Sequence, residues 1–416
     1  MARVLKVIEQ PFAMHRRMCI IMEVLRLGMA GASYFRILTE RVRQPAFNAL
    51  FLFVTSRCNS LCRTCFYFDK LNSRDDLTFD GIRRLSESAP PFRKLWLSGG
   101  EPTLREDLGA IIALFARNNG IRNVNLPTNG LLPDKLFRVL DDTLAHTPDH
   151  LAIDLNFSLD GLANTHDAIR GVPNNFERTL ATMRETEARY RHVRRLRRNV
   201  LSVITTENYN ELVELGLRLA EQGGLDGHYF EVVRGATPDP GMKALTRDDI
   251  ASLHRRLFPL HRHYARRLFA HLPAPARALA TAYYLGNLRL HFELHERCHE
   301  APSPWPMPCT AGQTALVVDH NGRFRACEMR GIIGNLHDHS MNLTAALRSR
   351  SVRDEIEAIA REGCWCTHSC FIHESSKFSP RVQLFEIPWA WWKQHSEQVA
   401  TAPFSELERF RNLELA

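Results

Sequence analysis

Short apolar runs alternate with longer segments of helical periodicity through the middle of the chain. The runs are rich in β-branched and aromatic residues, and the segments between them carry apolar residues three and four positions apart. Repeated strand–helix alternation predicts a parallel sheet that right-handed crossovers curl toward a barrel. Because a closed barrel needs about eight units, we expect an α/β fold with a partial (β/α)6 TIM-like barrel. The expected strands are 50–56, 94–98, 123–128, 152–159, 200–205 and 228–233.

The helical segments between these strands carry start and stop signals. The clearest is expected over 104–119, where Thr103 and Glu106 form a capping-box pattern and Gly120 ends the helix. Another is expected over 208–222, with leucines along one face.

The rest of the chain differs in composition and predicts further parts. The expected division is 1–49 as N-terminal amphipathic helices, 50–235 as the barrel, 236–300 as a helical insertion rich in His and Arg, and 301–416 as a C-terminal domain and tail. Within the last part, the strand-like runs 314–318 and 323–327 are joined through Asn321-Gly322, which predicts a β-hairpin followed by helices.

Composition narrows the class of protein. Of the 416 residues, 44% are apolar and 24% charged, as in ordinary globular domains. The longest apolar stretch, Met18 to Phe35, is interrupted by Glu23 and Arg26, so it does not predict a membrane span. The net charge of +8 is compatible with an anionic substrate and does not call for nucleic acid. The basic run Arg191 to Arg198 is interpreted as a solvated connection at the rim opposite the strand ends.

Cysteine usage points to metal or redox chemistry. Ten cysteines without a secretory signal fit a cytoplasmic protein, where disulfide frameworks are rare. Cys58, Cys62 and Cys65 follow the first expected strand in the spacing C-x3-C-x2-C. Three thiolates cannot close a four-coordinate site, so one metal position is left open for a group that is not protein.

Polar motifs also follow the next three expected strands. Because the carboxyl ends of parallel strands share one rim, these motifs should meet the cysteine triad there. They are Ser98 to Glu101, Thr128 to Gly130, and Ser158 to Asp160.

The triad, followed by Ser98-Gly99-Gly100-Glu101-Pro102 after the second strand, resembles the radical S-adenosylmethionine (SAM) superfamily over about residues 50–234. The resemblance implies that Cys58, Cys62 and Cys65 hold three irons of a [4Fe–4S] cluster. The fourth iron would then chelate S-adenosylmethionine. A structural zinc site is the alternative for the triad, although zinc usually takes four ligands from paired knuckles.

The same resemblance implies a set of cofactor-binding residues. Gly99 and Gly100 would let the backbone approach the methionine amine, and Glu101 would add negative charge near it. Ser158 and Asp160 would bind the ribose and methionine ends. The remaining residues of this set are Ser98 and Asn129, from the strand-end motifs, and Arg170. Arg170 would neutralise the methionine carboxylate; the alternative is a surface salt bridge.

A second group of cysteines lies around and after the expected hairpin. Cys309 and Cys327 flank it in the pattern C-x12-G-x4-C, and Cys364, Cys366 and Cys370 follow. This arrangement resembles the SPASM and twitch domains that hold auxiliary clusters, and it implies a second [4Fe–4S] cluster.

The ligands of this second site are left open. Five thiols suffice for one four-thiolate cluster with one thiol spare, and Cys298 or His368 could take part. A structural zinc site is again the alternative. Cys19 stands alone in an apolar helical pattern and is interpreted as a small buried hydrophobe.

The resemblance implies a radical enzyme with a flavodoxin- or ferredoxin-type reductant. It would cleave S-adenosylmethionine to a 5′-deoxyadenosyl radical and abstract hydrogen from a small-molecule or natural-product intermediate, with the auxiliary cluster assisting oxidation. Alternatives are a maturase of a ribosomal peptide, an enzyme with a lipid-linked substrate, and a non-catalytic iron–sulfur electron-transfer protein. Peripheral membrane contact through the N-terminus and the Trp-rich stretch 387–392 is a further possibility. No residue is predicted to act on the substrate.

Overall fold

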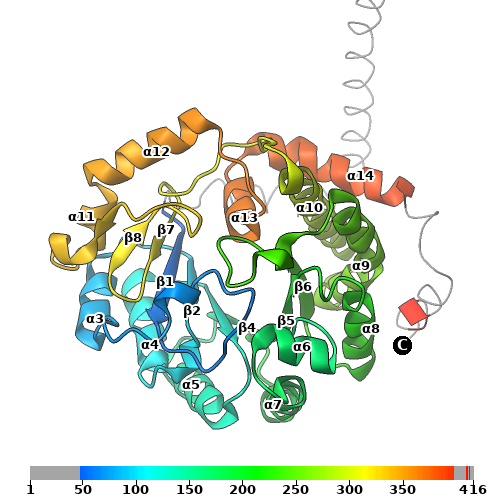
Figure 1. Cartoon of the computed structure of the whole chain (residues 1–416), viewed down its shortest axis with the longest axis horizontal. Helices are drawn as coiled ribbons and strands as arrows, with labels where there is room; N and C mark the ends of the chain where they lie inside the picture. The colour runs from blue at the N-terminus through cyan, green and yellow to red at the C-terminus, as the bar shows by residue number, and fades with distance from the viewer. Residues whose placement is uncertain (1–46, 398–408, 411, 413–416) are drawn as a thin grey trace, which may run out of the picture.

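Six parallel strands follow one another in chain order across a curved, open sheet (Figure 1). The computed structural model describes residues 47–397 together with 409, 410 and 412. The helices expected within 1–46, and Cys19 with them, lie outside these residues. The six strands are β1 (Ala49–Thr55), β2 (Lys94–Gly99), β3 (Asn123–Thr128), β4 (Ala152–Ser158), β5 (Leu196–Ile204) and β6 (Gly227–Val232). The predicted α/β class and open partial barrel are therefore confirmed.

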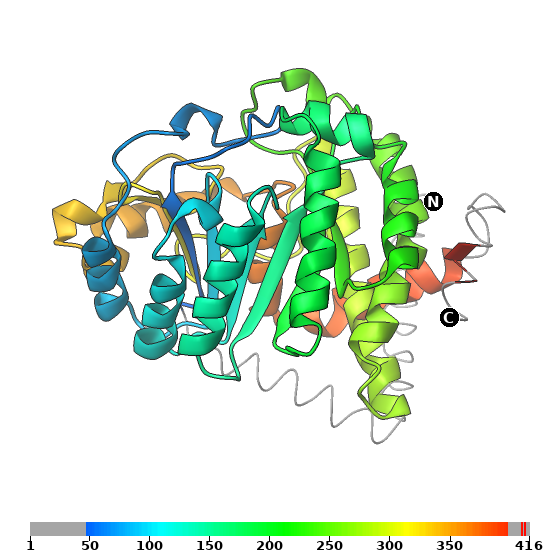
Figure 2. The same cartoon turned by 90° about the horizontal axis from the view of Figure 1, so that it is seen from below.

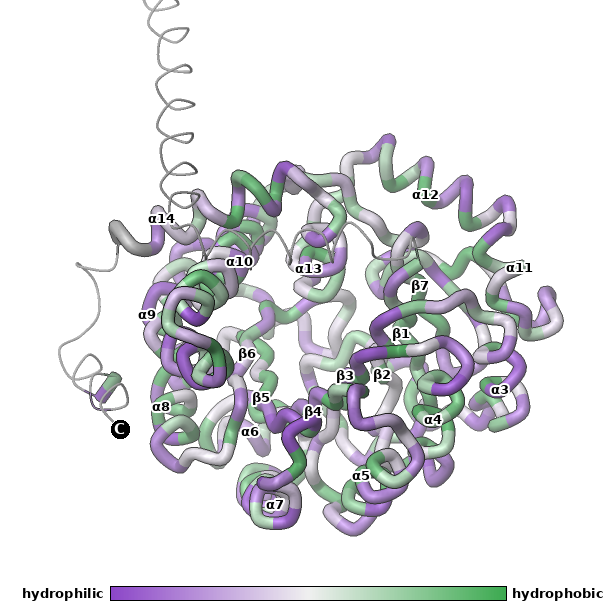
Figure 3. The backbone as a smooth tube through the Cα atoms, turned by 180° about the vertical axis from the view of Figure 1, so that it is seen from behind, coloured by the Kyte–Doolittle hydropathy of each residue, from purple (hydrophilic) through white to green (hydrophobic). Residues whose placement is uncertain are grey.

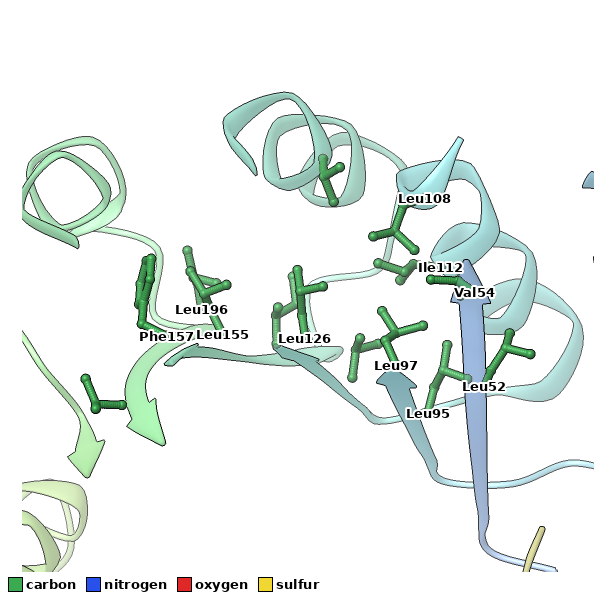
Figure 4. Close-up of a cluster of buried hydrophobic side chains, with 14 of the residues drawn as sticks. Leu52, Val54, Leu95, Leu97, Leu108, Ile112, Leu126, Leu155, Phe157 and Leu196 are labelled. Carbon is green, nitrogen blue, oxygen red and sulfur yellow. The ribbon is translucent and has the colours of Figure 1, made fainter. Parts of the chain in front are cut away.

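Helices cover the outer face of this sheet (Figure 2). They are α3 (Phe79–Ser88), α4 (Leu108–Asn119), α5 (Pro133–His146), α6 (Ala163–Arg170), α7 (Asn175–Tyr190) and α8 (Leu212–Gln222). Alternate side chains of each strand point toward them, as Leu52 and Val54 of β1 do when they meet Leu108 and Ile112 of α4 (Figure 4). The main core thus lies between the strands and the outer helices.

The second half of the chain continues the same sheet. After the long helices α9 (Arg247–Leu268) and α10 (Ala274–Glu300), β7 (Ala315–Val318) pairs in parallel with β1, with Ala49 opposite Ala315. The antiparallel strands β8 (Arg323–Arg325) and β9 (Gly334–Asn335) complete a nine-stranded sheet. The β7–β8 pair is the predicted hairpin through Asn321-Gly322.

Shorter elements complete the fold. The C-terminal helices are α11 (Leu343–Leu347), α12 (Arg350–Glu362), α13 (Ser369–Lys377) and α14 (Ile387–Glu397). The single turns are η1 (Phe68–Lys70), η2 (Pro102–Leu104), η3 (Pro240–Lys243), η4 (Leu336–His339) and the π-helical turn η5 (Val382–Glu386).

Helix α13 packs on the inner face of the barrel. Phe371 of α13 stacks on Phe51 of β1 with 5.0 Å between ring centroids, and Phe51 stacks on Trp96 of β2 at 5.4 Å. In Figure 1, α13 lies between the β1 and β6 sides of the open sheet. The tube in Figure 3, coloured by hydropathy, shows the outer helices banded with polar and apolar residues.

Two local predictions were wrong. The helix expected over 104–119 starts only at Leu108, because the Thr103 hydroxyl donates to Glu101 instead of capping a helix with Glu106. The basic run Arg191 to Arg198 is not a solvated connection throughout, since β5 begins at Leu196. Within that strand, Arg197 pairs with Asp154 of β4 at 2.6 Å.

Among the described helices, none is long and apolar enough to cross a membrane.

Candidate metal and cofactor site

The cysteine triad occupies the loop that leaves the carboxyl end of β1. Two backbone bonds fix this loop against the end of α6, from Leu61 N–H to the carbonyl of Arg170 (3.1 Å) and from Arg63 N–H to that of Ile169 (2.8 Å). On the other side, Cys58 N–H donates to the side-chain oxygen of Asn72 at 3.0 Å. The loop is therefore held in place by protein contacts on both sides.

The electrostatics of the triad suit a metal. Burial is the main factor that raises the pKa of Cys58 to about 12 and that of Cys65 to about 11, and Cys62 raises both further. The three thiols thus disfavour one another's ionisation, and an adjacent metal cation would reverse that effect. Three mutually close sulfur donors in one anchored loop fit the iron–sulfur cluster that the motif implies.

The Gly99-Gly100 pair brings the end of β2 against this loop. A Cβ atom at Gly100 would lie 2.0 Å from the carbonyl oxygen of Arg57, and one at Gly99 would lie 2.2 Å from that of Thr55. Gly99 also has φ +133°, which side chains disfavour. This close approach lets the N–H of Gly100 donate a hydrogen bond to the carbonyl oxygen of Thr55 at 2.8 Å. The two glycines are needed for close backbone packing beneath the cysteines.

Glu101 links three strand ends. Its carboxylate is 3% exposed and accepts hydrogen bonds from the Thr103 hydroxyl (2.6 Å) and the N–H of Asn129 (2.7 Å). Burial raises the pKa of this carboxyl, although these hydrogen bonds oppose the shift. Asn129 in turn donates its side-chain amide to Asn59 (2.7 Å) and Ser60 (3.1 Å), inside the cysteine loop. Glu101 and Asn129 therefore hold the loop in register with β2 and β3.

Asp160 and Arg170 form a buried ion pair beneath the triad. Asp160 is fully buried, and its Oδ2 lies 2.7 Å from the Nε of Arg170. Its other oxygen accepts the N–H of Val203 at 2.7 Å. Arg170 extends its Nη1 to within 3.7 Å of the Cys62 sulfur. Of the predicted cofactor residues, Arg170 is thus the one in contact with a triad cysteine, and Asp160 acts behind it.

Ser98 and Ser158 lie at the same rim. Ser98 is the penultimate residue of β2 and stands opposite Phe53 of β1, while Ser158 ends β4 opposite Leu201 of β5. The structure therefore brings all eight predicted cofactor residues to the carboxyl ends of the strands or just beyond.

A charged network that the motifs did not reveal lies between the two cysteine groups. Arg234, just after β6, bonds to Glu231 and, at 3.2 Å, to Glu328, and its guanidinium lies 5.2 Å from the ring centroid of Phe66. His368 lies 2.7 Å from Glu328. Burial alone would raise the pKa of Glu328, but His368 and Arg234 outweigh burial and lower it to about 2. The only sequence signal for this network was the position of Glu328 beside Cys327 and of His368 between two cysteines.

The second cysteine group is partly assembled. The free thiols of Cys309 and Cys364 lie close together, and their interaction lowers the pKa of Cys364 and, with burial, raises that of Cys309. Cys327 and Cys366 are close enough to influence these thiols, and burial raises the pKa of both.

Two further thiols have different surroundings. Cys370 is the second residue of α13, and the groups that act on it most strongly after burial are Glu231, Arg234 and Glu328 rather than thiols. Cys298 donates to the carbonyl of Ser303 at 3.2 Å. Within residues 47–397, no three His, Cys, Asp or Glu side chains are arranged to hold a single metal ion.

Comparison with known proteins identifies the barrel. Residues 52–218 match the family model of the radical SAM superfamily. This part of the chain is therefore similar to a radical SAM domain. The match begins within β1 and ends within α8, so it contains the cysteine triad, Gly99-Gly100, Asp160 and Arg170. The radical SAM family is one that binds a [4Fe–4S] cluster and S-adenosylmethionine.

Two curated relatives each match a part of the chain. The pre-heme d1 synthase of Dinoroseobacter shibae is 33% identical over 183 residues, which cover 42% of this chain and 41% of that protein. The GTP 3′,8-cyclase of Staphylococcus aureus is 34% identical over 123 residues, which cover 27% of this chain and 34% of that protein. The chain thus matches less than half of the length of either relative.

Solved structures extend the likeness in fold. Two structures described as anSMEcpe with bound AdoMet each superpose with a TM-score of 0.52 and cover 88% of this chain and 98% of theirs. Their sequence identities are 15% and 14%. At these identities the likeness concerns the fold alone.

Proposed function

We propose that the protein is a radical SAM enzyme in which Cys58, Cys62 and Cys65 hold a [4Fe–4S] cluster and the remaining iron binds S-adenosylmethionine. Together these groups supply a 5′-deoxyadenosyl radical that abstracts hydrogen from a substrate. The observation that carries the proposal is the anchoring of a three-thiol loop at the strand-end rim of a radical SAM domain.

The contributions of the surrounding residues follow from their contacts. Glu101 and Asn129 fix the loop, so the three thiols are presented together. Asp160 orients Arg170, which places a positive charge beside Cys62. That charge would attract the methionine carboxylate of S-adenosylmethionine. Ser98 and Ser158 offer hydroxyl groups at the same rim for polar parts of the cofactor.

A second, auxiliary [4Fe–4S] cluster is part of the proposal, with a SPASM- or twitch-like C-terminal domain around it. Its ligands are proposed to be Cys309, Cys327, Cys364 and Cys366, which act on one another's pKa. Cys298 also lies near Cys366 and Cys364, but its thiol donates to the Ser303 carbonyl, so it is left out of the proposed set. Cys370 then remains next to the Arg234 network. A flavodoxin- or ferredoxin-type protein would supply the electrons.

The preferred substrate is a polar small molecule. Between the cysteine groups lie the paired side chains of Glu231, Arg234 and Glu328, which would favour polar or charged groups and would disfavour a lipid chain. Two relatives of the radical SAM domain are named for making pre-heme d1 and for cyclising GTP, which supports this choice.

A peptide substrate is the second candidate. It is favoured by apolar side chains exposed at the rim, notably Leu61 (74% exposed) in the cysteine loop and Met329 (38%) after Cys327. A panel of candidate small molecules and candidate precursor peptides, assayed for substrate-dependent consumption of S-adenosylmethionine, separates the two classes.

The core proposal is tested with anaerobically reconstituted, full-length protein. With dithionite and S-adenosylmethionine, we expect 5′-deoxyadenosine and methionine to form, and we expect Cys62→Ala to abolish both while losing about four irons per chain. Cys298→Ala is the matched control and should retain both. Fully loaded protein that forms no 5′-deoxyadenosine would instead favour a non-catalytic electron-transfer role.

A further inference from the structure

Lys94 places an amine on the inner face of the barrel. It is the first residue of β2, and because Leu95 and Leu97 of this strand pack toward the outer helices, Lys94 shares the inner face with Trp96 and Ser98. Its Nζ lies 4.4 Å from the ring centroid of Trp96. Trp96 is nearer the carboxyl end of β2, so the amine leans toward the rim that carries the cysteine triad.

The amine of Lys94 has no acidic partner of its own. Within the part of the chain that the structure describes, its side chain forms no ion pair and no hydrogen bond. The two carboxylates that act on its pKa are each paired with another cation, Glu374 with Lys377 at 2.6 Å and Asp154 with Arg197 at 2.6 Å. A lysine in the interior without a carboxylate partner is uncommon, so the amine calls for another explanation.

The groups around Lys94 keep a large share of its amine uncharged. Helix α13 lies inside the open sheet (Figure 1) and presents Cys370, Glu374 and Lys377 along one side, while Asp154 faces the amine from β4. Burial is the main factor that lowers the pKa of Lys94 to about 7, and the charge of Lys377 comes second, whereas the other three groups oppose the shift. Desolvation beside a second cation is an arrangement that activates lysine as a nucleophile.

Solvent reaches this inner face. Lys94 and Trp96 are partly exposed, although β2 lies between β1 and β3 in the sheet. Further across the sheet, the side chains of Asp154 and Arg197 are 18% and 38% exposed. A small molecule can therefore approach the amine, and the stacked rings of Phe51 and Trp96 give it an apolar wall to rest against.

We propose that Lys94 is a nucleophile that binds an aldehyde or ketone as an imine inside the barrel. The uncharged amine attacks the carbonyl carbon, the C=O π electrons move to the oxygen, and the nitrogen loses a proton. The resulting carbinolamine loses its hydroxyl group as water and forms a C=N bond, so amine and carbonyl give imine and one water with no oxidant or reductant.

The position of Lys94 makes this imine the place where a carbonyl substrate is held. Ser98, the next inward-facing residue after Trp96, lies about 7 Å further along β2, at the cofactor rim. A molecule bound to Lys94 thus lies directly below the groups that would supply the radical. This placement rests on the proposed function, whereas imine formation does not.

Reductive trapping tests the proposal on full-length, reconstituted protein. Propionaldehyde and cyanoborohydride are added at pH 7 without dithionite or S-adenosylmethionine, and modification of each lysine is followed by peptide mass spectrometry. Lys94 should be modified about tenfold faster than Lys135 at the surface of α5, since a lysine amine in water is almost fully protonated at pH 7. In concentrated urea the two rates should become equal.

Variants and pH show whether the barrel interior causes the reactivity. The trapping rate of Lys94 should reach half of its maximum near pH 7 and level off above it. Lys377→Met removes the neighbouring positive charge, so it should raise the pKa of Lys94 and slow trapping severalfold at pH 7 but little at pH 9. The control Lys135→Met should leave trapping at Lys94 unchanged.

Two results would overturn the imine site. One is equal rates at Lys94 and Lys135 in the folded protein, and the other is a preference for Lys94 that persists in urea, because that preference would come from the local sequence. Failure of the radical proposal is distinguishable from both. Protein that forms 5′-deoxyadenosine but traps no aldehyde at Lys94 contradicts the imine alone, and protein with the opposite behaviour contradicts the radical chemistry alone.

Discussion

Arg170 forms an ion pair with the fully buried carboxylate of Asp160, with 2.7 Å between Nε and Oδ2, while its Nη1 lies 3.7 Å from the Cys62 sulfur. Burial would lower the pKa of Arg170, but Asp160 and then Cys62 outweigh it, so the guanidinium stays charged. Removal of Arg170 would leave an uncompensated carboxylate in the interior. Arg170→Met should therefore lower the free energy of unfolding by about 3–5 kcal/mol.

Urea unfolding of the apoprotein measures this effect. Arg63→Met is the control, because Arg63 pairs with Glu207 and Asp239 at a solvent-exposed position and should contribute only about 0–1 kcal/mol. If the two variants were equally stable, the buried pair would not be the structural support that its geometry indicates.

Gly100→Ala should prevent normal assembly of the cysteine loop. The added methyl group would lie 2.0 Å from the Arg57 carbonyl oxygen, so the β2 end or the loop must shift at a cost of about 1–3 kcal/mol. Iron incorporation at the triad, measured as iron bound per chain, should fall severalfold. Gly331→Ala is the matched control, since nothing lies within 4 Å of a Cβ there, and it should incorporate iron normally.

The lowered pKa of Lys94 leads us to expect an unusual pH dependence of the stability of the folded protein. Burial, with the charge of Lys377 second, lowers the pKa of Lys94 from 10.5 to about 7. Between these pH values Lys94 is neutral in the folded protein, whereas it binds a proton in the unfolded chain. The free-energy cost of burying Lys94 is therefore absent above pH 10.5 and grows as the pH falls toward 7. Lys94→Met removes that penalty and should stabilise the protein at pH 7 by a few kcal/mol, of the order set by the pKa shift.

Thermal unfolding across this pH range provides the measurement. The gain in Tm of Lys94→Met over wild type should shrink steadily as the pH is raised from 7 toward 10. Lys135→Met, at the surface of α5, should show no such trend. A gain that is independent of pH would mean that packing of the new side chain, rather than protonation of Lys94, is responsible.

The auxiliary site makes a prediction about individual cysteines. Cys309 and Cys364 act strongly on each other's pKa, whereas the Cys298 thiol donates to the backbone carbonyl of Ser303. Reconstituted Cys364→Ala should bind about four irons per chain instead of about eight, and Cys298→Ala should retain the full amount. Electron paramagnetic resonance of the reduced proteins should show loss of one signal in Cys364→Ala only.

Much of the barrel was predictable because its strands carry apolar residues either in a continuous run, as in β1, or at alternate positions, as in β3. The strand expected over 123–128 is β3 itself, and the others differ by one residue at most ends. The exception is β5, which starts at Leu196, four residues before the start expected from the sequence. Its first arginines looked solvated because sequence periodicity does not show that Asp154, on the neighbouring strand, neutralises Arg197.

The cofactor rim was predictable for a different reason. Strand-end motifs meet wherever the strands are parallel, so Ser98 to Glu101 and Asp160 could be placed from chain order alone. The Arg234 network could not, because Glu231 and Glu328 are 97 residues apart and meet only when the C-terminal hairpin folds back onto the barrel. Long-range ion pairs of this kind leave no local pattern in the sequence.

The parallel pairing of β7 with β1 has a consequence for any attempt to divide the protein. β1 has the sequence ALFLFVT and is buried on both faces, with β2 on one edge and β7 on the other. A fragment that ended before β7 would uncover the N–H and C=O groups along a flat, uncharged strand, which is a ready template for self-association. The two halves are therefore expected to be inseparable, and a truncated barrel should aggregate rather than report on the radical SAM domain by itself.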